Sequence, residues 1–124
     1  MPRALPALGL IALALAAPLP AAAEGFEPVT EEQQFLNLIK GRELRLALFG
    51  VGLRVLPDGQ ITGQALGTPV TGQWSWQGGY FCREMKWGAR PIPPNCQLVE
   101  ARGDDELRFT VDRGAGQSAA FALR

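Results

Sequence analysis

The chain has 124 residues, and its 12 basic and 12 acidic side chains leave no formal net charge. Nucleic-acid-binding domains need a clustered positive surface and some membrane anchors need a polybasic segment, so this balance argues against both classes. The complete absence of histidine removes Ser-His-Asp and Cys-His nucleophilic sites and nearly all histidine-based metal and haem sites.

The first 23 residues have the pattern of an export signal. Arg3 precedes the apolar run Ala4–Ala17, and Ala21–Ala23 supplies small residues for cleavage. The run is shorter than the roughly 20 apolar residues that span a bilayer, although an uncleaved apolar helix is the alternative. We predict a signal peptide over residues 1–23, cleavage near Ala23, no lipid or other stable membrane anchor, and a single periplasmic or secreted domain over residues 24–124.

A short helix is predicted next, over Glu31–Lys40. Thr30 and Gln33 have the spacing of a capping box, and Gly41 is a C-terminal stop signal. The apolar face of this helix comprises Phe35, Leu36 and Ile39.

After Gly41 the apolar residues alternate, as in β-strands. Leu44, Leu46 and Leu48 share one face, and Val51, Leu53 and Val55 resume the alternation after a bend at Gly50 and Gly52. The segment Pro57–Gly59 predicts a hairpin turn, with a partner strand over 61–65.

A second hairpin is predicted around the two-residue turn Gly78–Gly79, with Trp74 and Trp76 on one face and a return strand over 80–87. An extended, proline-braced loop is expected over 88–95. Further strands are expected at 96–101, at 107–111 and from Ala119 to the C-terminus.

This count of seven or eight short strands predicts an all-β fold. Because the connections are short, neighbouring strands are antiparallel, and closure into a barrel removes exposed sheet edges. We expect a small antiparallel up-and-down β-barrel with the N-terminal helix plugging or covering one end. An open two-layer sandwich is the alternative.

Cys82 and Cys96 are the only cysteines, and both lie in the predicted exported domain. An even cysteine count in an oxidising compartment favours a disulfide between them. The alternative redox or metal site is disfavoured because no Cys-x-x-Cys motif and no histidine are present.

Aromatic and basic side chains gather around the central hairpin and form the candidate ligand site. The candidates are Trp74, Trp76, Tyr80, Arg83, Trp87 and Arg90. A barrel mouth lined by Trp and Arg can stack a planar or anionic ligand; the simpler alternative is that Trp74 and Trp76 fill the core while the basic residues face water. The acidic run Asp104–Glu106 is interpreted as a solvated hairpin tip rather than a metal site.

The segment Gly114–Ala119 matches the Gly-x-Gly-x-x-Gly/Ala fingerprint of dinucleotide-binding enzymes. That fingerprint requires a following helix and an acidic residue about 20 positions later, and only five residues follow Ala119. We therefore predict a hairpin loop in which Gly114 and Gly116 supply positive φ.

The strings "GTPVTGQWSWQGGYFCREMKWG" and "RFTVDRGAGQSAAFALR" resemble a group of small exported proteobacterial proteins. Members are often labelled dihydrodipicolinate reductase, which implies reduction of a cyclic dicarboxylate by a nicotinamide cofactor. The reductase's Rossmann domain and His-His-x-x-Lys motif have no counterpart here, so no catalytic residue carries over. At fold level the chain is also similar to secreted metalloprotease inhibitors, in which an N-terminal segment, here Glu24–Val29, enters the protease cleft.

These observations predict a non-enzymatic periplasmic β-barrel, without a cofactor or metal, that binds a small ligand or a cell-envelope protein. The alternatives are a dihydrodipicolinate reductase-type oxidoreductase and a secreted protease inhibitor.

Overall fold

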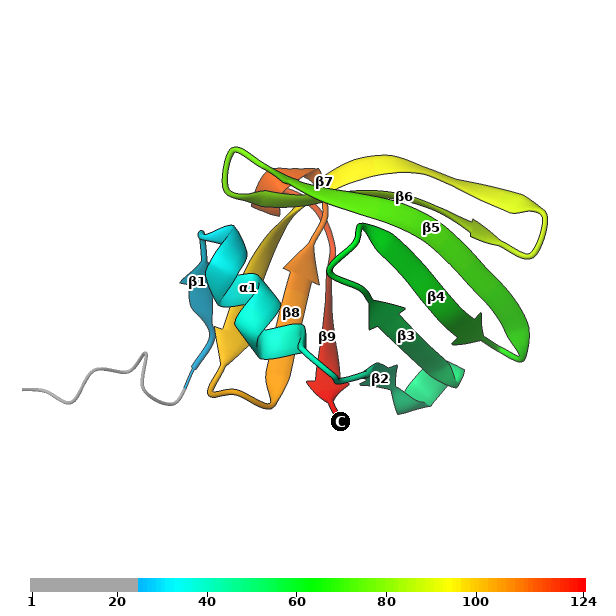
Figure 1. Ribbon diagram of the computed structural model, residues 1–124, viewed down its shortest axis with the longest axis horizontal. Coiled ribbons are helices and arrows are strands. Elements are labelled where there is room, and N and C mark those ends of the chain that lie inside the picture. The colour runs from blue at the N-terminus through cyan, green and yellow to red at the C-terminus, as the bar shows by residue number, and fades with distance from the viewer. Residues whose placement is uncertain (1–24) are drawn as a thin grey trace, which may run out of the picture.

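The computed structural model describes residues 25–124, and the predicted signal peptide and its cleavage site lie outside these described residues. The strands and the helix follow one another along the chain as drawn in Figure 1. Their bounds are β1 (Glu27–Val29), α1 (Glu32–Ile39), β2 (Leu44–Leu46), β3 (Val51–Val55), β4 (Gln60–Ala65), β5 (Thr68–Gln77), β6 (Tyr80–Trp87), β7 (Arg90–Arg102), β8 (Glu106–Thr110) and β9 (Ser118–Leu123).

Eight antiparallel strands, β2 to β9, close into a barrel. Each strand pairs with the next along the chain, and β9 returns to pair with β2. The short strand β1 is additional: it lies along β7, where Val29 is opposite Val99. The predicted barrel is therefore confirmed, and its closure excludes the open sandwich.

The helix α1 covers one end of the barrel, which we call the closed end. Phe35 is fully buried there, and its ring centroid lies 5.1 Å from that of Trp76 and 5.3 Å from that of Phe81. The predicted helix is confirmed to within one residue at each end, but the capping box is wrong. Glu31 is the N-cap residue without a side-chain cap, and Gln33 instead donates to Asn37.

The first predicted strand is shorter than its alternation suggested. It ends at Leu46, and Ala47–Phe49 form a 3-10 turn that closes at Gly50, where φ is 58°. Leu48 therefore does not share the inward face of Leu44, and its side chain is 79% exposed. The glycine, which accepts positive φ readily, turns the chain before the alternation can continue.

The predicted proline loop is also wrong over most of its length. Only Gly88 and Ala89 lie between strands, and β7 already begins at Arg90. The first half of β7 pairs with β6, whereas its pairing with β8 begins at Leu98. The prolines are tolerated because this half is an edge on the β8 side, where a strand needs no N–H donors.

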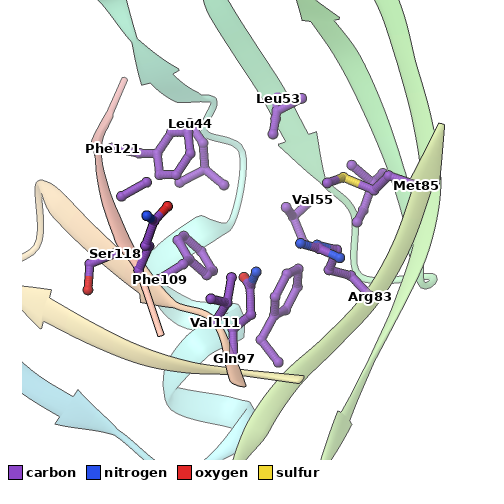
Figure 2. Close-up of a pocket in the computed structure, with 14 residues that line it drawn as sticks. Leu44, Leu53, Val55, Arg83, Met85, Gln97, Phe109, Val111, Ser118 and Phe121 are labelled. Atoms are coloured by element: carbon purple, nitrogen blue, oxygen red, sulfur yellow. The ribbon is translucent and has the colours of Figure 1, made fainter. Parts of the chain in front are cut away.

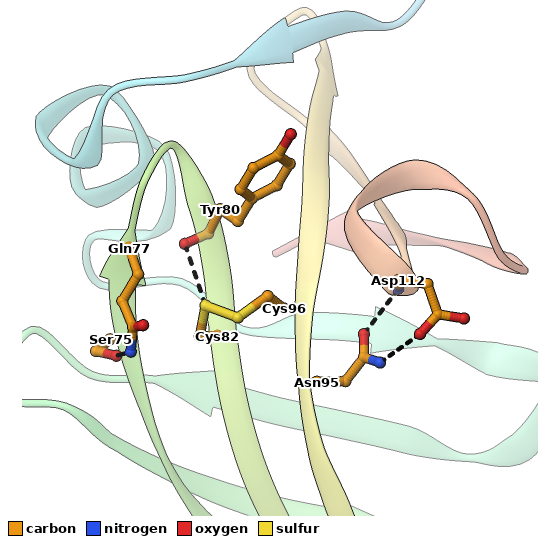
Figure 3. Close-up of a disulfide and its surroundings, with 7 residues drawn as sticks. All are labelled: Ser75, Gln77, Tyr80, Cys82, Asn95, Cys96 and Asp112. Carbon is orange, nitrogen blue, oxygen red and sulfur yellow. Dashed lines mark hydrogen bonds between the residues drawn. A yellow bond between two sulfur atoms is a disulfide. The ribbon is translucent and has the colours of Figure 1, made fainter.

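The disulfide between Cys82 and Cys96 is confirmed. The two residues are directly opposite each other on β6 and β7, and their sequence separation is 14 (Figure 3). Just beyond this pair, a bulge shifts the register of the two strands between Arg83 and Met85. The disulfide therefore joins β6 and β7 next to their irregular stretch.

Candidate functional site

The end of the barrel opposite α1, which we call the open end, has an incomplete wall. The strands β5, β6 and β7 are much longer than β8 and β9 and extend past them (Figure 1). β9 pairs with β2 only through Leu123 and Ala122. Within residues 25–124, the segment Ser118–Phe121 therefore has a strand partner on only one side, at β8.

A cavity of about 320 Å³ lies inside the barrel at this incomplete wall (Figure 2). Most of its surface is aliphatic or aromatic. The apolar lining includes Leu44, Leu53, Val55, Ile61, Met85, Phe109 and Phe121. We call the edge of Ser118–Phe121 that has no strand partner within residues 25–124 the unpaired seam. Because the cavity lining comes both from β3 and β4 and from β9, the cavity spans this seam.

Arg83 projects into this cavity. Arg83 is directly opposite Trp74 of β5, which is buried in the barrel core. Because directly opposite residues of paired strands lie on the same face of the sheet, the Arg83 side chain also points inward. Its Nη1 donates a hydrogen bond of 2.8 Å to the carbonyl of Pro93 in the bulged part of β7. Desolvation by burial lowers the pKa of the guanidinium, and within residues 25–124 no carboxylate forms an ion pair with it.

Gln97 is the second polar side chain of the cavity, and sequence analysis missed it. Its side chain lies opposite Phe81 and is only 7% exposed. No hydrogen-bond partner of its amide occurs among residues 25–124, and Figure 2 shows the amide facing the same space as Arg83. The alternation through Val99 could have revealed its inward orientation, because residues two apart share a face of a strand.

A second, mostly apolar hollow of about 320 Å³ continues the interior toward the tips of the long strands. Trp87 and Arg90 line it, and Trp87 Nε1 donates to the carbonyl of Ala65 at 2.8 Å. Leu53 and Met85 line both this hollow and the cavity. The open end is therefore mostly apolar from the Arg83 level outward, with the exposed Arg90 among its lining residues.

The remaining predicted site residues lie elsewhere. Trp74 and Trp76 fill the closed end, where their indole nitrogens donate to the carbonyls of Leu56 at 2.7 Å and Thr30 at 3.2 Å. Tyr80 does not line the cavity and lies under the guanidinium of Arg113. The structure thus separates the six candidates: Arg83 lines the cavity, Trp87 and Arg90 line the second hollow, and the other three line neither.

The dinucleotide-like segment forms the turn between β8 and β9. No helix follows it, and β9 begins at Ser118. The predicted positive φ is confirmed at Gly114, with a value of 98°, but it is wrong for Gly116. Gly116 is needed for close approach instead, because a Cβ there would lie 2.4 Å from the Val111 side chain.

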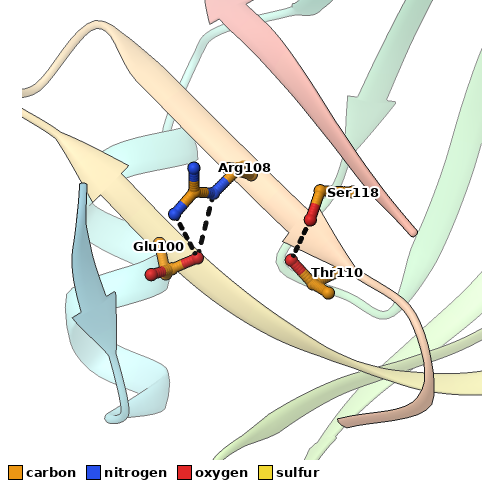
Figure 4. A network of polar contacts seen from close by, with 4 residues as sticks. All are labelled: Glu100, Arg108, Thr110 and Ser118. Atoms are coloured by element: carbon orange, nitrogen blue, oxygen red, sulfur yellow. Dashed lines mark hydrogen bonds and ion pairs between the residues drawn. The ribbon is translucent and has the colours of Figure 1, made fainter. Parts of the chain in front are cut away.

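Polar contacts hold this turn and its strands in place around the cavity. Asn95 accepts a hydrogen bond of 2.9 Å from the Asp112 backbone and donates one of 2.8 Å to its carboxylate (Figure 3). At the start of β9, the hydroxyls of Thr110 and Ser118 share a hydrogen bond of 2.6 Å (Figure 4). The open end is thus framed by fixed elements even where the strands do not pair.

Within residues 25–124 no group of three potential metal-ligating side chains occurs. The helix of this part of the chain is too short and too polar to cross a membrane. Comparisons with protein-family models, with curated proteins and with solved structures find no match. Function must therefore be inferred from the geometry of the barrel.

Proposed function

We propose that the protein is a non-enzymatic binding protein that holds a small ligand in the open end of its barrel. The cavity of about 320 Å³ at the unpaired seam carries this proposal. Ligand sites are typically concave, mostly apolar and furnished with a few polar groups, and their volumes start at about 300 Å³. The cavity has each of these properties.

The chemistry of the cavity favours holding a ligand over transforming it. The polar side chains that line it are those of Arg83, Gln97, Gln117 and Ser118; Arg83 is half-buried and Gln97 is buried. Arginine stays protonated in proteins and an amide neither gives nor takes a proton at neutral pH, so neither suits general acid–base catalysis. Both groups donate hydrogen bonds, which suits recognition.

The disulfide supports a site of action outside the cytoplasm, because disulfides persist mainly in oxidising compartments. We therefore place the protein in the periplasm or among the secreted proteins, in keeping with the predicted signal peptide. The protease-inhibitor alternative has less support, because Glu27–Val29 of the proposed inhibitory segment are paired with β7 and Val29 is fully buried.

Blocking the cavity tests the proposal. Ala119 lines it and is opposite the buried Phe109, so Ala119→Trp places an indole in the cavity. We expect the wild type to bind N-phenyl-1-naphthylamine, a neutral apolar fluorophore, and this variant to weaken its affinity by about tenfold or more, since a filled site excludes the probe. Fluorescence titration measures both affinities.

The matched control is Ala120→Trp. Ala120 is the next residue of β9 and is opposite Arg108, on the outer face. This variant should keep the wild-type affinity, and circular dichroism and thermal melts should show that both variants fold. Equal binding by all three proteins would place the probe outside the cavity, and no binding by the wild type would contradict the proposed function.

A further inference from the structure

We infer that the ligand of the open end is an amphiphile with a single anionic group, held by Arg83 and Gln97, and a compact apolar body. This inference rests on the proposed function and adds to it the chemical class of the ligand. The anionic group is of the carboxylate, sulfonate or phosphate type, since each offers oxygen acceptors to a guanidinium.

The first observation is a cation facing the cavity with no counter-charge. A guanidinium has five N–H donors. For Arg83 one hydrogen bond within residues 25–124 is identified, to the carbonyl of Pro93, and no carboxylate pairs with it. A desolvated charge is costly unless it is paired, so an anion arriving from solvent gains from a partner that the protein leaves free.

The second observation is independent of charge. Gln97 as a residue is more than nine-tenths buried and lines the same cavity, and no hydrogen-bond partner of its amide is identified among residues 25–124. Buried polar side chains are nearly always hydrogen-bonded, so an unpartnered amide facing a cavity indicates a polar group that enters it. Figure 2 shows this amide and the Arg83 guanidinium directed at one region. Together they offer several donors to one set of oxygen atoms.

The third observation sets the orientation of the ligand. Along β6, Phe81 lies on the closed-end side of Arg83, and Met85 lies on the open-end side. From Met85 outward the interior is mostly apolar, through Leu53 to the second hollow, where Arg90 is the charged residue among the apolar lining. The anionic group therefore lies at depth between Arg83 and Gln97, and the apolar body extends toward the open end.

Two fluorescent probes that differ by one charged group test this inference. 1-Anilinonaphthalene-8-sulfonate carries a sulfonate on the same apolar body as the neutral N-phenyl-1-naphthylamine. Arg83→Gln should weaken the affinity for the sulfonate probe by about tenfold or more, since a hydrogen bond to a charged group is worth roughly that factor. It should change the affinity for the neutral probe by less than about twofold. Arg54→Gln is the surface control, because Arg54 is exposed on β3, and it should change neither affinity.

Two further variants separate recognition from folding. Arg83→Lys keeps the charge and should recover part of the lost affinity for the sulfonate probe. Gln97→Leu should weaken the affinity for the sulfonate probe and leave the affinity for the neutral probe unchanged. If Arg83→Gln does not fold, these two decide the question in its place. Equal losses for both probes, or no loss for the sulfonate probe, would overturn the anionic ligand while leaving the cavity as a binding site. Failure of both probes to bind the wild type would overturn the proposed function as well.

Discussion

Single inward-facing residues decide which end of this barrel is filled. At the closed end large aromatic rings meet, with Phe35 between Trp74 and Phe81 at centroid distances of 5.5 and 5.3 Å. At the strands around the open end, glycines let backbones approach: a Cβ on Gly63 would lie 2.0 Å from the Gly52 carbonyl oxygen, and one on Gly72 would lie 2.3 Å from a carbonyl of β6. Such glycines mark tight bends of barrel strands and leave no side chain to fill the interior.

Replacing Phe35 tests the closed end. Phe35→Ala should lower the free energy of unfolding by about 3–5 kcal/mol, because it removes a fully buried ring and leaves a cavity among four other aromatic rings. Urea unfolding followed by tryptophan fluorescence measures this change. Phe49→Ala removes the same ring where it is half exposed, and should cost no more than about 0.5 kcal/mol. Equal losses in the two variants would mean that α1 does not stabilise the barrel.

At the scale of elements, the disulfide joins β6 and β7 beside the stretch where their register is irregular. Replacing Cys82 and Cys96 by alanine should lower the free energy of unfolding by about 3 kcal/mol, since it frees a loop of about 15 residues in the unfolded chain. Thermal melts with and without reductant measure this: reductant should destabilise the wild type and leave the double variant unchanged. Detection of two free thiols in the unreduced protein would contradict the pairing.

The elements that sequence patterns predicted well are those with strong local signals. The helix follows from its apolar period, and the hairpins at Gly59 and Gly78–Gly79 follow from residues that accept positive φ, with 97°, 58° and 89° observed. β1 was missed because three residues carry no detectable period. The first half of β7 was missed because its prolines suggest a loop, and only the pairing partner on the other side shows that they sit on an edge.

The candidate site was predictable in part. The position of Arg83 on the Trp74 face follows from strand alternation, but the same rule also selected Trp74 and Trp76, which fill the core. Whether an inward side chain packs against another side chain or borders a cavity depends on the register offset between the strands when the sheet closes into a barrel. That offset comes from pairings distant in sequence, such as Leu44 with Leu123, which a local pattern does not contain.

At the scale of the whole molecule, the aromatic core and the proposed binding site lie at opposite ends. Val29, Phe35, Val99 and Leu107, whose side chains have no exposed surface, lie toward the closed end, whereas the fully buried Ile61 lines the cavity. Among residues 25–124, the open end has an unpaired seam, a cation without a counter-charge and, in the buried Gln97, an amide for which no hydrogen bond is identified. Binding sites are commonly drawn from the less stable part of a fold, so this division is what a ligand-holding barrel requires.

Hydrogen exchange followed by mass spectrometry tests this division directly. Amides of β7 around Val99 and of β8 should exchange slowest, because both strands are paired on both sides there. The segment Ser118–Phe121 should exchange faster, since one of its edges has no strand partner within residues 25–124. Saturating N-phenyl-1-naphthylamine should slow exchange in that segment and in β3, which form the two sides of the seam, and leave β1 unchanged. Uniform protection without the probe, or slowing at β1 as strong as at the seam, would show that the two ends of the barrel do not differ in this way.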